Sequence, residues 1–381
     1  MRTVGERLVE GLAARGVRVV FGIPGVHTVE LYRGLSGSVI RHVTARHEQG
    51  CAFMADGYAR VSGQPGVAFV ITGPGLTNAL TAMAQSRGDS VPVLIISGVN
   101  RRDSLGRGLG LLHELPDQAA MVRALCPTRQ ITQAADLAPV LDWAFDLLTT
   151  GRPGPVHIEV PTDVMPLPCD ALPNPAPRSL HVVPDLGAAA TRLNAARKVV
   201  ILSGGGCRGQ EVALQALAER LDAPVVQTVN ARGMLHRHPL CVAVSPSVKS
   251  VRALLKSADQ VLAIGTEFGP TEYDMYGEGG FPNLASQIRI DISADQLARH
   301  PAAVTLLGDA GATMTALLPL LTQHDAKGAE RAETATRIAR TELPDFSPAF
   351  PAMLAMIETI RTALPRCILV GDSTQPVYAA N

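Results

Sequence analysis

The sequence predicts an α/β protein made of successive doubly wound parallel-sheet domains. The main evidence is a set of short apolar runs, such as residues 67–72 and 198–203, each followed by a glycine turn and a segment with helical spacing. Continuous apolar runs are typical of strands buried on both faces of a parallel sheet. With 381 residues, the chain is also long enough for two or three domains with substantial cores.

In the first part of the chain, strands and helices alternate. Strands are predicted over residues 17–21, 40–43, 67–72, 92–97 and 152–161, the last of which should close the sheet. Helices are predicted over residues 3–15, 29–35, 76–84 and 137–148, with a further one that begins at Glu48. Ligands of such sheets bind at the carboxyl ends of the strands. The turns at residues 22–25 and 73–75 therefore lie at the ligand edge, and the glycine-rich loop 100–118 is a candidate lid.

A carboxylate stands at the head of one predicted helix. Glu48 opens a segment in which Cys51, Ala52, Ala55 and Ala59 share one helical face. These side chains are small, so the face can press against another backbone, and a carboxylate at its head would be partly desolvated. Burial suits a glutamate to proton exchange or to a strong hydrogen bond with a protonated nitrogen. An ordinary first-turn acidic residue of a surface helix explains Glu48 equally well.

The second part of the chain repeats the pattern after a proline-rich linker. Strands are predicted over residues 198–203, 224–228, 260–265 and 287–292, and helices over 188–196, 211–221 and 309–323. The glycine turn at 204–209 is similar to a dinucleotide fingerprint, but no acidic residue near 228–230 could hold a ribose. The hypothesis of a nicotinamide-dependent dehydrogenase therefore depends on this turn alone, and a plain helix–sheet turn is the simpler interpretation.

The last part of the chain predicts the start of a further domain. Residues 323–333 are charged and rich in alanine, as in a solvated linker or helix. Residues 350–364 form an amphipathic helical pattern, and 367–370 read as a strand that leads into a polar, hydroxyl-rich turn. A strand with no sheet to join looks like the first strand of a domain whose remainder is missing.

Composition excludes several classes of function. Thirty-four basic residues balance thirty-four acidic ones, so no electrostatic argument supports a nucleic-acid or membrane partner. Residues 1–16 lack the long apolar core of a signal peptide, and no apolar run is long enough to span a bilayer, which predicts a cytoplasmic protein. The six cysteines form no CxxC pair, so they fit neither a zinc site nor a disulfide framework.

Several short motifs together carry a family resemblance. They are Gly22-Ile23-Pro24-Gly25, Arg46-His47-Glu48, Ala55-Asp56-Gly57-Tyr58-Ala59-Arg60, Thr72-Gly73-Pro74-Gly75-Leu76-Thr77-Asn78 and Asp89-Ser90-Val91-Pro92-Val93. In this order the motifs resemble the thiamine diphosphate enzymes of the acetolactate synthase and 2-oxo acid decarboxylase group. Within that group, the segments at 26–32, 97–101, 112–114 and 371–378 are most similar to the 5-guanidino-2-oxopentanoate decarboxylases of arginine breakdown.

The resemblance implies a thiamine diphosphate-binding fold followed by a Rossmann-like middle domain. The expected boundaries are a pyrimidine-binding domain, a proline-rich linker, the middle domain, a second linker and the start of a truncated diphosphate-binding domain. They fall at residues 1–165, 166–179, 180–325, 326–344 and 345–381.

The resemblance also gives individual residues a role. The family's glutamate at the position of Glu48 hydrogen-bonds N1′ of the cofactor's aminopyrimidine and favours the imino form that removes the thiazolium C2 proton. His113 falls where relatives place a polar side chain near C2, although a histidine in a loop is more often simply hydrogen-bonded. The positions that match the pyrimidine and diphosphate contacts are Gly25, Pro74, Asn78, Ser373, Thr374 and Gln375.

The sequence departs from the family at the diphosphate end. Relatives hold the diphosphate through Mg²⁺, bound by a Gly-Asp-Gly segment and later asparagines, and nothing here corresponds, since Asp372 lies in the wrong element. We therefore predict no metal ligand in this chain and expect the Mg²⁺ ligands in a C-terminal part that it lacks, which would leave these 381 residues alone inactive. Residues 266–268 stand where flavin-binding relatives carry an arginine-rich segment, so no FAD is predicted.

The implied activity is thiamine diphosphate-dependent decarboxylation of a 2-oxo acid, with 5-guanidino-2-oxopentanoate as the best candidate. The alternatives are an acetolactate synthase-type carboligase and a non-catalytic, truncated relative. The implied partners are a small-molecule 2-oxo acid and further copies of the chain, in a homodimer or homotetramer with the site between subunits. A guanidinium substrate should meet a carboxylate, for which Glu114, Asp117 and Glu267 are candidates, each equally explained as a solvated loop charge.

Overall fold

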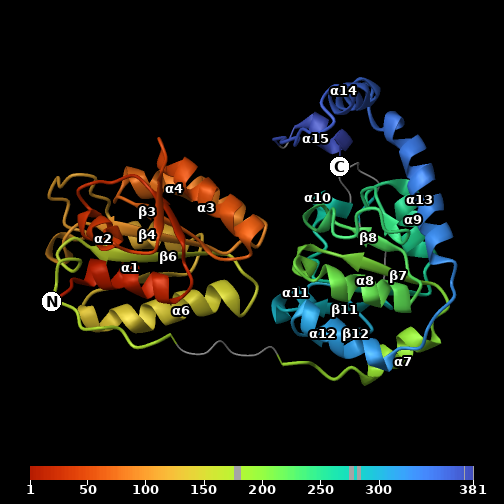
Figure 1. Ribbon diagram of the computed structural model, residues 1–381, viewed down its shortest axis with the longest axis horizontal. Helices are drawn as coiled ribbons and strands as arrows, with labels where there is room; N and C mark the ends of the chain where they lie inside the picture. The colour runs from red at the N-terminus through yellow and green to blue at the C-terminus, as the bar shows by residue number, and fades with distance from the viewer. Residues whose placement is uncertain (176–181, 274–278, 281–284, 373, 381) are drawn as a thin grey trace. The chain divides into compact units, whose positions relative to one another are not determined.

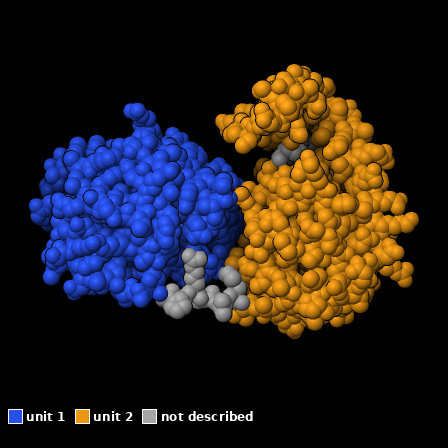
Figure 2. All heavy atoms as spheres, in the orientation of Figure 1, with its two compact units in different colours: residues 1–180 blue, residues 181–381 orange. Residues whose placement is uncertain are grey.

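The protein consists of two compact units, residues 1–180 and 181–381 (Figure 2). We describe them from a computed structural model, which covers residues 1–175, 182–273, 279–280, 285–372 and 374–380. Each unit contains a six-stranded parallel sheet. The predicted α/β class is therefore confirmed. Within the described residues, no helix combines the length and apolar character needed to cross a membrane.

The sheet of the first unit has the strand order β2-β1-β3-β4-β6-β5. The strands are β1 Val19–Gly22, β2 Arg41–Thr44, β3 Gly66–Val70, β4 Val93–Val99, β5 Thr128–Gln130 and β6 Pro155–Pro161. Register pairs Gly22 with Phe69 and Val70 with Ser97, so neighbouring strands end at a common edge. The prediction that residues 152–161 close the sheet was wrong. The edge strand is β5, which is too short and polar to stand out in the sequence.

Helices cover both faces of this sheet (Figure 1). They are α1 Val4–Ala14, α2 Val29–Leu35, α3 Glu48–Ser62, α4 Pro74–Gly88, α5 Gln118–Arg123 and α6 Leu137–Thr149. One apolar cluster joins α1, α2 and α6 to one face, and a second joins α3, α4 and α5 to the other. Local signals set the helix ends: Thr3 and Glu6 form a capping box at α1, and Gly63, at φ 68°, ends α3.

The predicted small-residue face of α3 is confirmed, since Cys51, Ala52, Ala55 and Ala59 are all buried. It presses on the sheet so closely that a Cβ atom at Gly66 of β3 would lie 1.9 Å from the carbonyl oxygen of Ala55. Only glycine allows this approach of helix and strand backbones.

The sheet of the second unit has the order β12-β11-β10-β7-β8-β9. Its strands are β7 Val199–Ser203, β8 Val225–Gln227, β9 Cys241–Val242, β10 Gln260–Ile264, β11 Ile288–Asp291 and β12 Val304–Leu307. Its larger helices are α7 Gly187–Ala195, α8 Glu211–Arg220, α9 Lys249–Ser257, α12 Ala310–Leu317 and α13 Gly328–Glu342. Helices α7, α8 and α12 pack on one face, and α9 and α13 pack on the other.

Helix α13 occupies most of residues 326–344, for which a linker is predicted. Glu330, Glu333, Arg337 and Arg340 are exposed, while Ala332, Ala335 and Ala339 are buried in the same apolar cluster as the sheet. The spacing of these alanines explains how a segment of high charge still packs as a helix.

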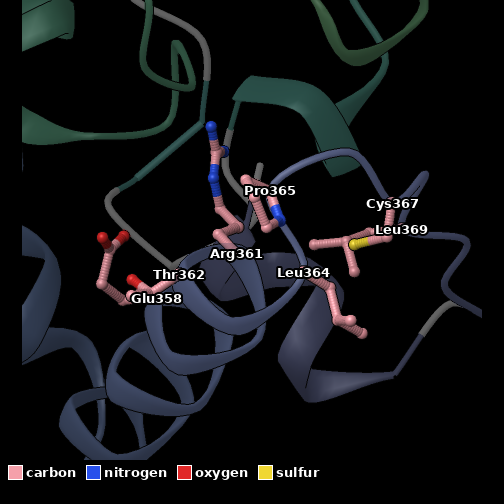
Figure 3. A pocket seen from close by; sticks show the side chains of 7 residues that line it. All are labelled: Glu358, Arg361, Thr362, Leu364, Pro365, Cys367 and Leu369. Carbon is pink, nitrogen blue, oxygen red and sulfur yellow. The ribbon is translucent and has the colours of Figure 1, made fainter.

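The C-terminal segment contains α14 Phe350–Ala363 and α15 Gln375–Ala380. The predicted strand at 367–370 was wrong: these residues form neither strand nor helix. Ile368 and Val370 are 89% and 93% exposed, and no strand among the described residues pairs with them. A shallow pocket opens between α14 and this segment, lined in part by Arg361, Cys367 and Leu369 (Figure 3).

Candidate functional site

Two of the residues predicted for a site in the first unit, Glu48 and Asn78, lie at the carboxyl edge of its sheet. Glu48 is the first residue of α3, which follows β2, and Asn78 lies one turn into α4, which follows β3. The two are 30 residues apart in sequence, yet Nδ2 of Asn78 donates a hydrogen bond of 3.1 Å to Oε2 of Glu48. The side chain of Glu48 is half-buried, and its Oε1 has no hydrogen-bond partner among the described residues. Oε2 is thus held in place, and Oε1 can accept a hydrogen bond from a ligand.

Glycines allow close packing next to this carboxylate. A Cβ atom at Gly75 would lie 2.6 Å from the side chain of Ile71 and 3.8 Å from Cγ of Glu48. At Gly25, in the turn after β1, an added Cβ would lie 2.5 Å from the same isoleucine. Pro74 is exposed at the first position of α4, where its fixed φ suits a helix start. The glycines therefore let both turns pack against Ile71 beside Glu48.

The turn at Gly73 connects this region to His113. Gly73 has a φ of 60°, and a Cβ on it would lie 2.4 Å from the carbonyl oxygen of His113. His113 itself has a φ of 58°, a conformation that is uncommon for a residue with a side chain. The predicted candidate His113 is therefore held against the start of α4 by backbone contact.

A second histidine, His27, lies beside His113 and escaped the sequence analysis. Their ring centroids are 6.0 Å apart, and His27 is only 7% exposed. Burial, together with the charge of a protonated His113, lowers the pKa of His27. Its Nδ1 is buried without a hydrogen-bond partner in the described part of the chain. A histidine in a glycine turn after a strand was the available signal for this residue.

Glu114 and Asp117, two candidates for a guanidinium partner, already have other partners. The carboxylate of Glu114 accepts hydrogen bonds from the backbone N–H groups of Leu109 (3.1 Å) and Leu111 (2.9 Å), which lowers its pKa. Asp117 caps α5 through the N–H of Ala120 at 2.8 Å and lies 3.6 Å from a guanidinium nitrogen of Arg123. These contacts compete with substrate binding. The third candidate, Glu267, is exposed in the second unit after β10.

Buried polar side chains lie directly beneath the site, and sequence reasoning did not single them out. Gln118 at the start of α5 and Glu159 on β6 are 3% and 2% exposed, and Nε2 of Gln118 donates to the Glu159 carboxylate at 2.7 Å. Gln130 of β5 donates to the other oxygen of Glu159 at 2.7 Å. Burial raises the pKa of Glu159, and the two amide hydrogen bonds act against that shift. A carboxylate in a strand flanked by prolines was the only sequence signal for this network.

Acidification is expected to destabilise the first unit through His157. This side chain is fully buried, and its Nε2 lies 2.8 Å from Oγ of Ser97. Burial lowers the pKa of His157 from 6.5 to about 3, so between these values the unfolded chain binds a proton that the folded chain does not. The stability present above pH 6.5 is therefore lost as the pH falls, by about 2 kcal/mol at pH 5. The free energy of unfolding is measured with urea at about pH 7 and at about pH 5. Its decrease between the two pH values should be smaller in His157→Asn than in the wild type, by about 2 kcal/mol. An unchanged loss would contradict this assignment.

The predicted diphosphate contacts lie in the second unit. Ser373 falls outside the described residues. Thr374 is exposed, and its N–H donates to the carbonyl oxygen of Asp372 at 2.7 Å. Gln375 begins α15 and is exposed. Their role in binding stays a prediction.

No metal centre is evident in the described residues, where no three His, Cys, Asp or Glu side chains cluster closely enough to hold an ion. The glycine turn of the second unit, which is similar to a dinucleotide fingerprint, has a packing role. A Cβ at Gly204 would lie 2.2 Å from the carbonyl oxygen of Gly265, and one at Gly206 would lie 2.8 Å from its Cα. The glycines let two neighbouring turns touch, which agrees with the simpler interpretation of this turn.

Comparison with known proteins gives matches along most of the chain. Residues 2–121 match the N-terminal TPP binding domain of thiamine pyrophosphate enzymes, and residues 186–317 match their central domain. Probable 2-ketoarginine decarboxylase AruI of Pseudomonas aeruginosa is 42% identical over 388 residues, which cover 100% of this chain and 69% of that protein.

Acetolactate synthases are more distant relatives. The isozyme 1 large subunit of Escherichia coli is 32% identical over 334 residues, covering 84% of this chain and 58% of the synthase. Acetolactate synthase of Mycobacterium bovis is 33% identical over 341 residues, covering 86% of this chain and 54% of the synthase. The chain thus spans little more than half the length of these two synthases.

Proposed function

Because this chain belongs to the thiamine pyrophosphate enzyme family, we propose that it is a thiamine diphosphate-dependent carboxy-lyase acting on 5-guanidino-2-oxopentanoate. The observation that carries the proposal is the half-buried carboxylate of Glu48, oriented by Asn78 at the ligand edge of the sheet. The name of the 42% identical relative, a probable 2-ketoarginine decarboxylase, supports the substrate.

The residues at the sheet edge fit the pyrimidine half of the cofactor. Bound there, thiamine diphosphate would supply the electron sink for the bond broken on loss of carbon dioxide. Glu48 offers its Oε1 to a ring N–H, while Asn78 keeps the carboxylate in place through Oε2. Gly25 and Pro74 would line the site of the pyrimidine ring. His113 would hold or transfer a proton at the substrate carbon, since an imidazole ring can both donate and accept a hydrogen bond.

The proposals for the diphosphate half of the cofactor and for the assembly are drawn from the family resemblance. We propose that Mg²⁺ would bind together with the diphosphate, as is typical of the family, and that Ser373, Thr374 and Gln375 would belong to that pocket. We assign no metal ligand in this chain and propose no FAD. A cytoplasmic homodimer or homotetramer with the site between subunits follows from the family resemblance. The domain boundaries given above also remain proposals.

A carboligase of the acetolactate synthase type is the second candidate, favoured by relatives at 32% and 33% identity. Product analysis with pyruvate alone separates the two activities, because a carboligase joins two substrate molecules and a simple decarboxylase releases an aldehyde. A truncated relative without activity would give neither product.

We expect the intact protein, with thiamine diphosphate and Mg²⁺, to convert 5-guanidino-2-oxopentanoate and one proton into carbon dioxide and 4-guanidinobutanal in equal amounts. The measurement is carbon dioxide release coupled to aldehyde detection, with pyruvate as the comparison substrate. A preference for pyruvate would contradict the proposed substrate, and no turnover of either acid would contradict the activity itself.

A further inference from the structure

We propose that Gln118 is a positioning residue. Its side-chain amide hydrogen-bonds to the Gly73 turn, the end of β4 and Glu159, and these bonds together fix the positions of His27 and His113. The importance of this role for catalysis rests on the proposed function, but the positioning itself does not. Gln118 lies 3% exposed at the start of α5, behind the loop that carries His113.

The amide of Gln118 uses both of its ends. Oε1 accepts hydrogen bonds from the hydroxyl of Thr72 and from the N–H of Gly73, both at 2.8 Å. Nε2 donates to the carbonyl oxygen of Gly98 at 3.0 Å, to Glu159 at 2.7 Å and, more weakly, to Ser97 at 3.3 Å. One side chain therefore joins the segments after β3 and at the end of β4 to β6.

The two glycines bonded to Gln118 are the ones against which the histidines pack. A Cβ on Gly73 would lie 2.4 Å from the carbonyl oxygen of His113, and a Cβ on Gly98 would lie 2.6 Å from the carbonyl oxygen of His27. Movement of either glycine would displace the histidine backbone that touches it. Gln118 thus acts on the histidines through these glycines, without touching either ring.

A hydrogen bond from the other end of the loop also holds the segment around His113. Nδ2 of Asn100, just after β4, donates to the carbonyl oxygen of Leu112 at 3.2 Å. With Gln118 on the far side, the segment around His113 is held at both ends. Its left-handed backbone conformation needs such support, because a residue with a side chain rarely adopts it unaided.

An amide offers both kinds of hydrogen bond that this position needs without binding a proton. Thr72 and Gly73 require an acceptor, whereas Gly98 and Glu159 require a donor, and a carboxyl group of the same length offers both only when it is protonated. A carboxylate at position 118 would face the Glu159 carboxylate without a proton between them. The other titratable groups around this pair are Asp117 and Arg123 near α5 and His157 on β6.

The test compares Gln118→Leu with Gln130→Leu in the intact protein. Each variant removes one of the two amide hydrogen bonds to Glu159, but only Gln118→Leu releases Gly73 and Gly98. The first readout is hydrogen–deuterium exchange of the Gly73 amide, and the second is the Kd for thiamine diphosphate. We expect Gln118→Leu to raise both the exchange rate and the Kd by about 10-fold or more, and Gln130→Leu to change each by less than about twofold.

Equal effects of the two variants, or an unchanged Gly73 exchange rate in Gln118→Leu, would overturn the proposal. If the wild type neither binds thiamine diphosphate nor releases carbon dioxide, the proposed function fails, while the exchange result still decides the positioning role.

A second variant covers the case in which Gln118→Leu does not fold. In Gln118→Glu the new carboxyl group can still accept from Gly73, and a proton bound at acidic pH would restore the donor toward Glu159. Gly73 exchange, corrected for its intrinsic pH dependence, should therefore be about 10-fold faster than in the wild type near pH 8 and approach it near pH 5. A difference that does not change with pH would overturn the proposal.

Discussion

Glu48→Gln is expected to lower carbon dioxide release by about 10²- to 10⁴-fold. Glutamine keeps the size of the side chain and can still accept a hydrogen bond from Asn78, but it cannot carry the negative charge that favours proton transfer at a ring nitrogen. The Kd for thiamine diphosphate should change by less than about threefold, because the shape of the pocket is retained. Turnover is measured as carbon dioxide release and binding by calorimetry.

Asn78→Leu provides the matched control for this experiment. It keeps the approximate size of the side chain and removes the 3.1 Å hydrogen bond, so it disturbs the orientation of Glu48 without placing a second carboxylate beside it. Turnover should fall less than in Glu48→Gln. A Glu48→Gln enzyme with wild-type turnover would remove Glu48 from the mechanism.

Gly66→Ala is expected to have the largest effect on stability. The added Cβ would lie 1.9 Å from the carbonyl oxygen and 2.5 Å from the carbonyl carbon of Ala55, and both are backbone atoms that cannot rotate away. Helix α3 must therefore shift off the sheet, at a cost of about 3 kcal/mol or more. Urea unfolding measures this cost. Because α3 carries Glu48, thiamine diphosphate binding should weaken as well.

Gly57→Ala tests the same helix without the clash. Gly57 is exposed, and an added Cβ there would meet nothing within 4 Å. Replacing an exposed helical glycine by alanine should stabilise the protein by about 0.5–1 kcal/mol. Equal stability of Gly66→Ala and the wild type would contradict the close packing of α3 on β3.

Local sequence patterns were sufficient to predict the parts of the fold that position Glu48. The small-residue face of α3, the buried strand β3 and the Gly73–Gly75 turn each have a signature within a few neighbouring residues. The rule that ligands bind at the carboxyl ends of parallel strands then placed the turns at 22–25 and 73–75 at one edge. The hydrogen bond between Glu48 and Asn78 lies at that edge, but Asn78 was singled out only by the family resemblance.

Features that depend on distant partners were not predictable in this way. Strand β5 is a three-residue polar segment that exists because β6 offers it a free edge. The predicted strand at 367–370 has the right residue types but no described strand to pair with it. Strand formation depends on such partners more than helix formation does, because its hydrogen bonds lie between segments.

The buried network at Gln118 was hidden for a related reason. Glutamine and glutamate are usually surface residues, and Gln118 and Glu159 are 41 residues apart in sequence. Only the fold shows that α5 begins against β6 and that both side chains are covered. His27 was missed because its burial depends on Gly98 of another strand.

The central claim is that Glu48 activates thiamine diphosphate bound at the sheet edge, and proton exchange at the cofactor's C2 position tests it most directly. Wild-type protein and Glu48→Gln are saturated with thiamine diphosphate and Mg²⁺, diluted into D₂O and quenched with acid, and the remaining C2 proton is quantified by NMR. We predict exchange at least about 10²-fold faster in the wild type than in Glu48→Gln, whose rate should approach that of free cofactor. Equal exchange rates in the two proteins would contradict the claim.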